Sequence, residues 1–338
     1  MTKKVRSLSD LAKLAGVSGS TASRALNNNK LISAKTREKI QKLAAAHDFK
    51  INTAARNFRL KTSNTIAVVI IKSSEHDQSF TDPFVLNIVG IIADELSRHK
   101  YDLLLVSHNI AQTSSLDDYF TMNRADGLIV FGQGDDMDAF DKLINHQKPI
   151  VVWGGQSKNS DYVTVGTDNF MGGELATQHL VKQGCQNIVF CGMRSFETGL
   201  RFAGYQQVLK NAQLQQPNPL DIHFTFEDAY KVTLALLKNN QFNYDGIVAA
   251  SDSIALGMMR ALNEQGVSVP EQVAIVGYDD ISVCAFTQPS LSSIHQDTQK
   301  GGEALVSALL DLLNKKPVDS VVLDTQLMIR DSSCRKLN

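Results

Sequence analysis

Apolar residues recur at helical spacing in the stretch "LSDLAKLA", which lies between Ser7 and Gly16. Ser7 is suited to cap this helix, with Asp10 completing a capping box, and Gly16 is suited to end it. A second short apolar face follows after a turn of only three or four residues, behind a new N-cap at Ser18, and consists of Ala22, Ala25 and Leu26. Two short helices at this separation predict a helix-turn-helix.

A third amphipathic stretch, "SAKTREKIQKLAAAH", begins at Ser33, which is a further N-cap candidate. Its inward face consists of Ile40, Leu43 and Ala44. Three small helices with these apolar faces can share one core. We therefore expect an all-α module at the N-terminus.

From Thr65 onward the pattern changes to short apolar runs, rich in β-branched residues, that alternate with helical stretches. The runs are "TIAVVII", "YDLLLVS", "DGLIVF", "PIVVW", "NIVFCG", "DGIVAA" and "VAIVGYDD". Continuous apolar runs separated by helices are typical of parallel strands buried on both faces, and therefore of a doubly wound α/β fold. The segments "ADGLIVFGQGDDMDAF" and "YDGIVAASDSIALGMM" resemble each other, which indicates two similar lobes.

Charge is distributed unevenly along the 338 residues, although the net charge is only −1. Residues 1–62 hold 14 Lys and Arg against 3 Asp and Glu, a net charge of +11, and the other 276 residues hold 20 against 32, a net charge of −12. A basic module on an acidic body is the pattern expected of a nucleic-acid-binding domain attached to a domain with another task. The alternative, a merely solvated charged surface, is weakened by the helix-turn-helix spacing.

The composition indicates the cellular compartment of the protein and whether it holds disulfides or a metal site. The chain has no run of 18 apolar residues, and its N-terminus lacks the apolar core of a secretion signal, so we expect a cytoplasmic protein without a membrane segment. The four cysteines lie far apart without CxxC spacing, which favours reduced thiols over disulfides or a zinc site: Cys185, Cys191, Cys284 and Cys334. We expect neither a metal nor a cofactor.

The second helix turns polar side chains outward: Ser20, Thr21, Ser23, Arg24 and Asn27. Hydroxyl groups and the N–H groups of a helix N-terminus, here capped by Ser18, bind phosphates without reading sequence. An arginine in the major groove donates two hydrogen bonds to O6 and N7 of guanine. We therefore predict that Arg24 reads a base and that the hydroxyl groups position the helix on the DNA backbone.

The motifs "AGVSGSTASRALN" and "SAKTREKIQKLAAAHDFKINTAARNFR" resemble the headpiece of the lactose repressor (LacI/GalR) family of bacterial transcription regulators, and the resemblance extends over the whole chain. It implies that the second helix lies in the major groove and that a hinge after the third helix becomes helical on operator DNA. The DNA-contacting set then includes Asn52, Arg56 and Phe58, and Phe58 would wedge into the minor groove at a central base step.

The resemblance also implies the fold: an N-terminal all-α helix-turn-helix headpiece plus an α/β periplasmic-binding-protein-like body of two doubly wound parallel-sheet lobes. We expect the chain to pass between the lobes near residues 164, 291 and 320. The predicted domains are a headpiece (1–50), a hinge (51–62) and an effector-binding and dimerisation domain (63–338), with an N-lobe at about 63–163 and 292–320 and a C-lobe at about 164–291 and 321–338.

Several residues differ from the usual pattern of that family. Phe58 stands where leucine is usual, which bears on the fit of the wedge at the central base step. Asp48 and Ile51 stand where glycine and proline are usual, which predicts a less sharply ended third helix and hinge entry. Gly19 offers no side chain for base contact, so base readout should rest on Ser20 and Arg24.

Polar residues that follow the apolar runs are candidate ligand contacts, because open α/β sheets bind ligands beyond the carboxyl ends of their strands. Carboxylates and an arginine can bind adjacent hydroxyl groups, and an aromatic ring can cover a sugar, so these residue types favour a carbohydrate. The candidates are Ser79, Asp82, Phe84, Arg201, Asp252 and Asp279, and the resemblance adds Gln296. Gly154 stands where the family usually has an acidic contact.

Each candidate also has a structural interpretation. Asp168 and Asp252 both lie where a helix begins and could be N-caps rather than ligand contacts. Trp153 could stack on a sugar but is better explained as a core residue. Arg201, on an otherwise apolar helix face, needs an anionic or hydroxyl partner if it is buried, which favours a ligand role.

These features predict a sequence-specific DNA-binding transcriptional regulator, preferably a repressor, whose operator affinity is controlled by a small ligand between the two lobes. Headpieces one helical turn apart, or a small multiple, require a homodimer on a near-palindromic operator. An enzyme is disfavoured, because "GQGDDM" lacks the third glycine of a dinucleotide loop and no GxSxG, HExxH or Walker motif occurs. A sugar-binding protein without a regulatory role and a ligand-dependent activator remain alternatives.

Overall fold

The chain forms two compact units, Met1–Ser63 and Asn64–Asn338. The structure, a computed structural model, describes residues 5, 7–49, 62–72, 80–109, 115–132, 140, 144, 147–155, 162–193 and 195–335.

The N-terminal unit is a bundle of three helices, α1 (Leu8–Ala15), α2 (Gly19–Leu26) and α3 (Ala34–Ala46). Ser7 and Asp10 form the predicted capping box of α1, and Gly16 ends that helix in the left-handed conformation, at φ 71°. The three helices share a small core that consists of Val5, Leu11, Ala15, Ala25, Ile40 and Ala44. The predicted helix-turn-helix module is therefore present.

The end of α3 differs from the prediction. Asp48 adopts the left-handed conformation at φ 47°, and the N–H of Phe49 donates to the carbonyl of Ala44 at 2.8 Å. A glycine usually provides this arrangement at a helix C-terminus. The expectation of a less sharply ended helix is wrong, because aspartate tolerates the left-handed region better than most residues.

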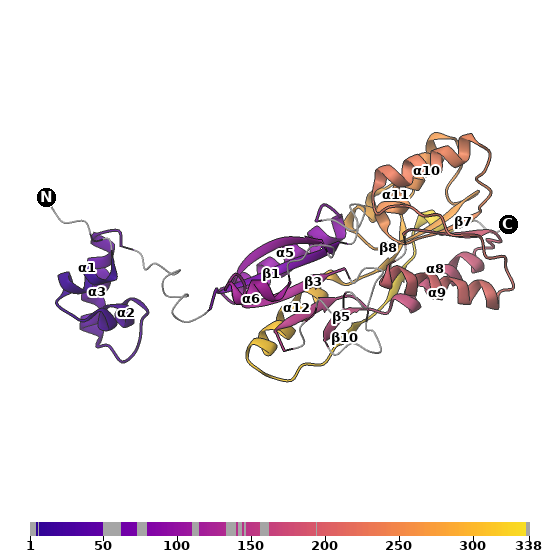
Figure 1. Ribbon diagram of the computed structural model, residues 1–338. Helices are drawn as coiled ribbons and strands as arrows, with labels where there is room; N and C mark the ends of the chain where they lie inside the picture. Colours follow the sequence, from indigo (N-terminus) through magenta and orange to yellow (C-terminus); the bar gives the residue numbers. More distant parts are fainter. Residues whose placement is uncertain are drawn as a thin grey trace. The chain divides into compact units, whose positions relative to one another are not determined.

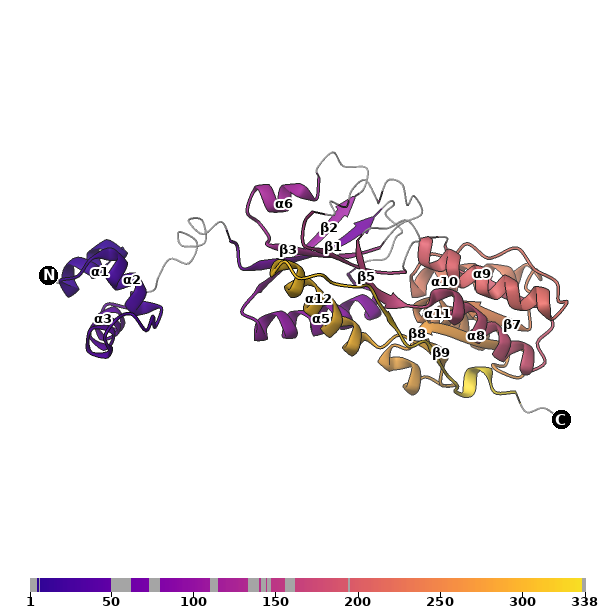
Figure 2. The ribbon, with the colours of Figure 1, turned by 90° about the horizontal axis from the view of Figure 1, so that it is seen from below.

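The first sheet of the body has six strands, all parallel to their neighbours. In spatial order they are β10 (Val321–Leu323), β5 (Val163–Thr167), β4 (Ile150–Trp153), β3 (Gly127–Phe131), β1 (Thr65–Lys72) and β2 (Asp102–Asn109). Figure 2 shows α5 (Pro83–Arg98) and α12 (Thr298–Leu313) on one face of this sheet and α6 (Asp117–Thr121) on the other. Alternate residues of β1 accordingly enter two different apolar cores.

The second sheet has five strands, and its edge strand β11 runs antiparallel to β9 while the others are parallel. In spatial order they are β11 (Gln326–Met328), β9 (Ser292–His295), β8 (Ala274–Asp279), β7 (Gly246–Ala249) and β6 (Ile188–Cys191). Figure 1 shows the pair α8 (Asn169–Lys182) and α9 (Phe196–Asn211) on one side and the pair α10 (Phe226–Lys238) and α11 (Asp252–Glu264) on the other. Two short 3-10 helices, η1 (Ser282–Phe286) and η2 (Asp331–Ser333), complete this lobe. The doubly wound two-lobe body is therefore confirmed.

The chain passes between the sheets three times, a few residues later than the predicted positions 164, 291 and 320. β5 still belongs to the first sheet through Thr167, β9 belongs to the second sheet through His295, and β10 belongs to the first sheet through Leu323. Hydrogen bonds join the crossings, since Thr167 Oγ1 donates to Gln296 Oε1 at 2.8 Å and the N–H of Asp168 donates to Thr325 Oγ1 at 3.1 Å. The three crossing segments therefore lie side by side.

Within the part of the chain that the structure describes, no helix is both long enough and apolar enough to span a membrane.

Candidate DNA-binding and effector sites

The outward face of α2 carries the predicted DNA-contacting residues. Ser20, Arg24 and Asn27 are exposed, and Thr21 and Ser23 are half-buried. Ala22 and Ala25, on the opposite side, are buried in the headpiece core and so determine which side chains face outward. These polar groups are accessible on one helix, and their contact with DNA stays a prediction.

A cluster of hydroxyl groups lies at the N-terminus of α2. Ser18 Oγ accepts the N–H of Thr21 at 3.2 Å, and it lies 2.9 Å from both Ser20 Oγ and Thr21 Oγ1. At the other end of the helix, the Asn27 side-chain amide donates to the Ser23 carbonyl at 2.8 Å. Hydroxyl donors beside a helix N-terminus are suited to bind a phosphate, because the helix dipole favours negative charge there.

Four predicted contact residues lie outside the described residues: Asn52, Arg56 and Phe58 of the hinge, and Ser79 of the body. Their roles stay predictions from the sequence.

Asp279 ends β8 at the carboxyl edge of the second sheet and is connected directly to the crossing segments. Gln296 Nε2 donates to Asp279 Oδ1 at 2.7 Å, and Gln296 Oε1 accepts the hydrogen bond of Thr167 Oγ1. The backbone of Asp279 is held at φ 108°, a conformation that a non-glycine residue rarely adopts and that often marks a functional position. A ligand that binds Asp279 would therefore lie two hydrogen bonds from the first crossing.

Arg201 of α9 is buried and already partnered. Its Nε donates to Asn169 Oδ1 at 2.7 Å, its Nη1 donates to the Ala250 carbonyl at 2.6 Å, and its guanidinium lies 3.6 Å from the ring centroid of Tyr278. The burial predicted for Arg201 is present, and two of its five N–H groups already donate to protein acceptors. Sequence reasoning missed both acceptors, because Asn169 is distant along the chain and Ala250 contributes only its backbone.

Asp82 connects the two lobes. Its Oδ1 caps α5 by accepting the N–H groups of Phe84 and Val85 at 3.0 and 3.2 Å, and Ser253 Oγ at the start of α11 lies 3.5 Å from its Oδ2. Ser253 was not among the sequence candidates. Asp82 is therefore both a helix cap and a residue at the junction between the lobes.

Phe84 and Trp153 are core residues. Both belong to the apolar core between the first sheet and its two helices α5 and α12, with their ring centroids 5.8 Å apart. The preferred interpretation of Trp153 therefore holds, and the geometry does not support Phe84 as the ring that covers a sugar. Gly155, one residue beyond Gly154, instead lies close to Leu200 and Phe196 of the opposite lobe.

Asp252 is fully buried and acts within the protein. Its Oδ1 accepts the hydroxyl of Ser293 at 2.6 Å, and its Oδ2 accepts the N–H of Ile281 at 2.8 Å and the thiol of Cys284 at 3.1 Å. Ser251, not Asp252, is the N-cap of α11, whereas Asp168 does cap α8. Asp252 therefore joins α11, β9 and η1, and a direct ligand contact by its carboxylate is not supported.

Burial dominates the electrostatics of this region. It raises the pKa of Asp279 well above its usual range; the nearby Arg201 opposes this shift, and Asp252 and Asp82 add to it. Burial likewise raises the pKa of Asp252 to about 7, against the hydrogen bonds from Ser293, Ile281 and Cys284. One guanidinium and two further carboxyl groups therefore act on Asp279, and burial favours the protonated form of both Asp279 and Asp252.

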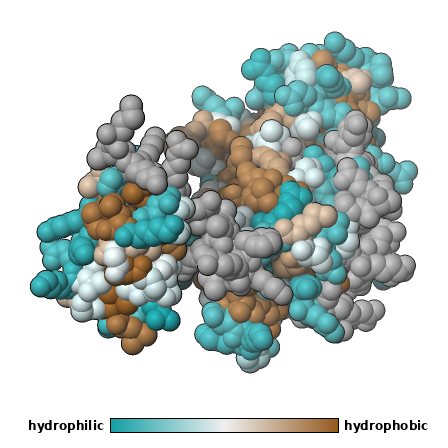
Figure 3. Space-filling model, turned by 60° about the vertical axis from the view of Figure 1, so that its left-hand side comes forward, coloured by the Kyte–Doolittle hydropathy of each residue, from teal (hydrophilic) through white to brown (hydrophobic). Residues whose placement is uncertain are grey.

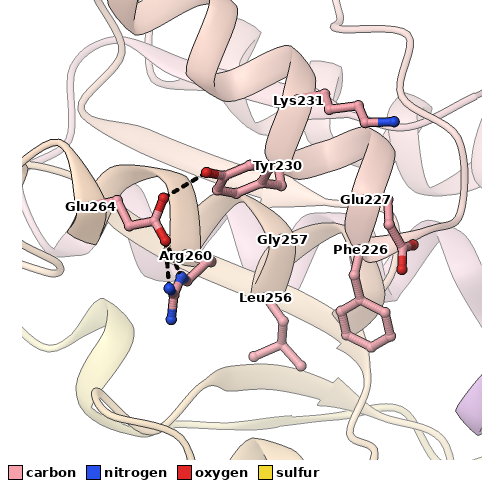
Figure 4. A pocket seen from close by; sticks show the side chains of 8 residues that line it. All are labelled: Phe226, Glu227, Tyr230, Lys231, Leu256, Gly257, Arg260 and Glu264. Atoms are coloured by element: carbon pink, nitrogen blue, oxygen red, sulfur yellow. Dashed lines mark hydrogen bonds and ion pairs between the residues drawn. The ribbon is translucent and has the colours of Figure 1, made fainter.

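A groove of about 490 Å³ lies on the outer side of the C-lobe, between α10 and α11. Phe226, Leu256 and Gly257 contribute its apolar part, and Glu264 accepts hydrogen bonds from Tyr230 and Arg260 along its edge (Figure 4).

Other apolar side chains are exposed on the body. Phe286 of η1 is 86% exposed, and Leu86 of α5 is 55% exposed. On the face that Figure 3 shows, apolar residues form a patch in the middle of the body, with hydrophilic residues around it. Contiguous exposed apolar surface is typical of protein–protein contact sites.

The chain matches two family profiles. Residues 7–52 match "Bacterial regulatory proteins, lacI family", and residues 177–333 match "Periplasmic binding protein-like domain". It is also 27% identical to the transcriptional repressor PurR of Pasteurella multocida, over 96% of this chain and 98% of that protein. The chain belongs to the lacI family of bacterial regulatory proteins.

Two solved structures extend the likeness. The lac repressor dimer bound to operator and the anti-inducer ONPF is 25% identical, covers 98% of this chain and 99% of that one, and has a TM-score of 0.83. The complex of the regulator CelR with cellobiose is also 25% identical in sequence. The match covers 97% of this chain and 100% of that one, with a TM-score of 0.67. The lacI-family chain is therefore a DNA-binding transcriptional regulator with a ligand-binding body, and the prediction of a regulator rather than an enzyme is confirmed.

Proposed function

We propose that this lacI-family regulator binds a near-palindromic operator as a homodimer, as a repressor, and that a carbohydrate bound between its two lobes changes its operator affinity. The observation that carries the proposal is the hydrogen-bonded chain from Asp279 through Gln296 to Thr167. It connects a candidate ligand contact to the segments about which the lobes would turn.

On the DNA side, Arg24 is the proposed base reader, with Ser20 beside it. Ser18, Thr21 and Ser23 would position α2 on the phosphates, since their hydroxyl groups lie at or near its N-terminus or on its outward face. Asn27 would contact the backbone at the other end of the helix. The hinge residues Asn52, Arg56 and Phe58 belong to the same proposal, with Phe58 as the wedge in the minor groove.

On the effector side, the relatives bound to cellobiose and to ONPF support a carbohydrate ligand. Asp279, Arg201 and Gln296 are the proposed contacts, with Asp82 facing them from the other lobe and Ser79 as a further contact. Asp279 and Gln296 are joined by a hydrogen bond, and Asp82 lies close enough to Asp279 to raise its pKa. Carboxylates and amides of this kind accept from and donate to neighbouring hydroxyl groups.

The signal would pass through the crossings. Ligand binding would change the hydrogen bonds of Asp279 and Gln296 and thereby favour one angle between the lobes over another. In a dimer the two N-lobes carry the two hinges, so a change in their angle changes the order of the hinges and the affinity for operator.

The α10–α11 groove and the exposed Phe286 are the proposed contacts of the C-lobe with a second copy. The lac repressor relative is a dimer on its operator. An exposed phenylalanine and an open apolar groove are suited to an interface that excludes water. We propose that the dimer is a cytoplasmic protein, because its target is DNA.

The experiment is a selection of operators from random duplex DNA by the full-length protein, combined with light scattering of the free protein. The proposal expects a dimer and an enriched near-palindrome with two half-sites. Enrichment of a single asymmetric site by a monomer would contradict it. Addition of cellobiose or another neutral sugar to the selected complex then tests for a change in operator affinity.

A further inference from the structure

We propose that Asp126 is the positioning residue that connects the N-lobe to the hinge: its carboxylate fixes the point at which the chain enters the body, so that a movement of the N-lobe reaches the DNA-binding segment. This inference rests on the proposed control of operator affinity by a ligand, and it names the contact through which that control leaves the body.

The body begins at Asn64, just after the predicted hinge (51–62). The N–H of Asn64 donates to Asp126 Oδ2 at 2.8 Å, and its carbonyl accepts the N–H of Asp102 at 2.8 Å. Its backbone adopts the left-handed conformation, at φ 52°, which asparagine tolerates better than most residues. Both polar backbone groups of Asn64 are therefore bound by the body, and its conformation sets the direction of the chain that precedes it.

These contacts attach Asn64 to the amino ends of three neighbouring strands of the first sheet. β1 begins at Thr65, whose carbonyl accepts the N–H of Asp126 at 2.8 Å. Asp102 is the first residue of β2, and Asp126 directly precedes β3. Alternate residues of β1 enter the two apolar cores on either face of this sheet. Because a close-packed sheet moves as a unit, a rotation of the N-lobe carries Asn64 with it.

The contact lies at the opposite end of the strands from the crossings. Thr167, which bonds to Gln296 of the second crossing, is the last residue of β5, whereas Asn64 precedes the first residue of β1. Because β1 has eight residues, the two edges of the sheet are about 26 Å apart. A change that begins at the crossings therefore has to cross the first sheet before it reaches the hinge, and Asp126 lies where it arrives.

The second lobe contains the same contact without a hinge. The similar segments "ADGLIVF" and "YDGIVAA" place Asp126 and Asp245 each directly before a glycine that begins a strand. Asp245 accepts the N–H groups of Gln186 and Asn187 at 2.9 and 2.8 Å, just before β6. Asn64 and Gln186 hold equivalent places, two residues before the strand residue that pairs with that glycine. Of the two carboxylates, Asp126 holds a segment that leads to the DNA, and Asp245 holds one that comes from α8.

The experiment compares variants of these two carboxylates in the full-length protein: Asp126→Ala, Asp126→Asn, Asp245→Ala and Asp245→Asn. Alanine removes the hydrogen-bond acceptor, whereas asparagine keeps a neutral one. Thermal unfolding measures the structural cost of each change. Anisotropy measures the affinity for the selected operator and for random DNA, with and without the probes cellobiose and D-ribose. Calorimetry measures the affinity of each variant for these probes.

The expected effect of Asp126→Ala is on operator binding and on coupling. Operator affinity should fall about tenfold, the effect of one hydrogen bond to a charged group, while the affinity for random DNA is unchanged. A probe that changes the operator affinity of the wild type should still bind this variant, but should change its operator affinity less than about twofold. Asp126→Asn should recover most of both properties. Both Asp245 variants should bind DNA and respond like the wild type, even where they lower the unfolding temperature as much.

The outcomes separate this inference from the proposed function. Full operator affinity and full response in Asp126→Ala overturn the inference, and so do equal losses in Asp245→Ala, because the effect would then follow stability. If neither probe changes the operator affinity of the wild type, control by these sugars is rejected, and the operator affinities of the two alanine variants decide the inference alone.

A second pair of variants serves if Asp126→Ala does not fold. Asn64→Val disfavours the left-handed conformation and should reduce operator affinity, whereas Asn64→Gly keeps that conformation and should not. Equal operator affinity of these two variants would overturn the inference.

Discussion

The helices α8 and α9 pack so closely that adding a single methyl group at their contact should displace residues of the effector site. A Cβ atom added at Gly173 of α8 would lie 2.0 Å from the carbonyl oxygen of Arg201, whereas ordinary contacts begin at 3.4 Å. The obstacle is backbone, which cannot rotate away. Gly173→Ala therefore requires the two helices to separate by more than 1 Å.

The magnitude follows from two opposing effects. Alanine gains up to about 1 kcal/mol over glycine in a helix. Overpacking typically costs about 1–3 kcal/mol, and a backbone obstacle belongs at the upper end of that range. We expect Gly173→Ala to lose about 2 kcal/mol of unfolding free energy.

The control is Gly199→Ala on α9, because a Cβ at Gly199 meets nothing within 4 Å. That variant should gain about 0.5–1 kcal/mol. Urea unfolding followed by far-UV circular dichroism measures both free energies, and calorimetry measures effector affinity, which Gly173→Ala should also reduce because Arg201 moves with its backbone. Equal stability of the two variants would refute the close packing of α8 on α9.

Four further predictions concern the headpiece, the hinge and the buried acid. Asp48→Gly should stabilise the headpiece by about 1 kcal/mol in thermal melts, because glycine adopts the left-handed conformation without strain; a loss of stability would contradict this. Burial raises the pKa of Asp252 to about 7, above the value of about 3.9 in an unfolded chain, so its proton stabilises the fold most at low pH and this stabilisation is lost as pH rises to 7. The difference in unfolding free energy between wild type and Asp252→Asn, measured by urea titration, should accordingly fall by up to about 1.4 kcal/mol per pH unit between pH 5 and 7. A difference that stays constant over this range would contradict the raised pKa of Asp252. Arg24→Ala should weaken operator binding by about 1–3 kcal/mol in anisotropy titrations while sparing random DNA, and equal losses would remove it as a base reader. Phe58→Ala should reduce operator affinity and DNA bending together in gel-shift assays, while Phe58→Leu retains most of both; unchanged bending in Phe58→Ala would exclude the wedge.

Local signals in the sequence were sufficient for the headpiece and for most of the body. Ser7, Gly16, Ser18 and Ser33 cap or end helices as predicted, because capping depends on residues only a few positions apart. The seven apolar runs all became strands, because β-branched residues in continuous runs suit a buried parallel sheet.

The short strands at the crossings could not be predicted in the same way. These strands are β5, β9, β10 and β11, which either contain Thr, Ser, Gly or Gln or consist of only three residues. They form strands because they pair with a neighbouring strand of the sheet, not because of their own β-propensity. For this reason the predicted crossings lie a few residues too early.

The sequence identified residues of the candidate site, but it did not predict what each of them contacts. The sequence places Asp252 at the start of a helix, but only the fold brings Ser293, Ile281 and Cys284 against its carboxylate. The partners of Arg201 likewise come from two other elements of the C-lobe. Such roles depend on contacts between residues far apart in sequence, which no local pattern records.

The most direct test of the account is whether the effector acts through Arg201 on operator affinity. Fluorescence anisotropy would measure binding of the selected operator by wild type, Arg201→Gln and the control Arg98→Gln, an exposed arginine of α5, with and without the bound neutral sugar. The account predicts that the sugar changes the operator affinity of wild type and Arg98→Gln, and that Arg201→Gln binds operator like ligand-free wild type and no longer responds. An unaltered response in Arg201→Gln would place the effector site elsewhere and contradict the account.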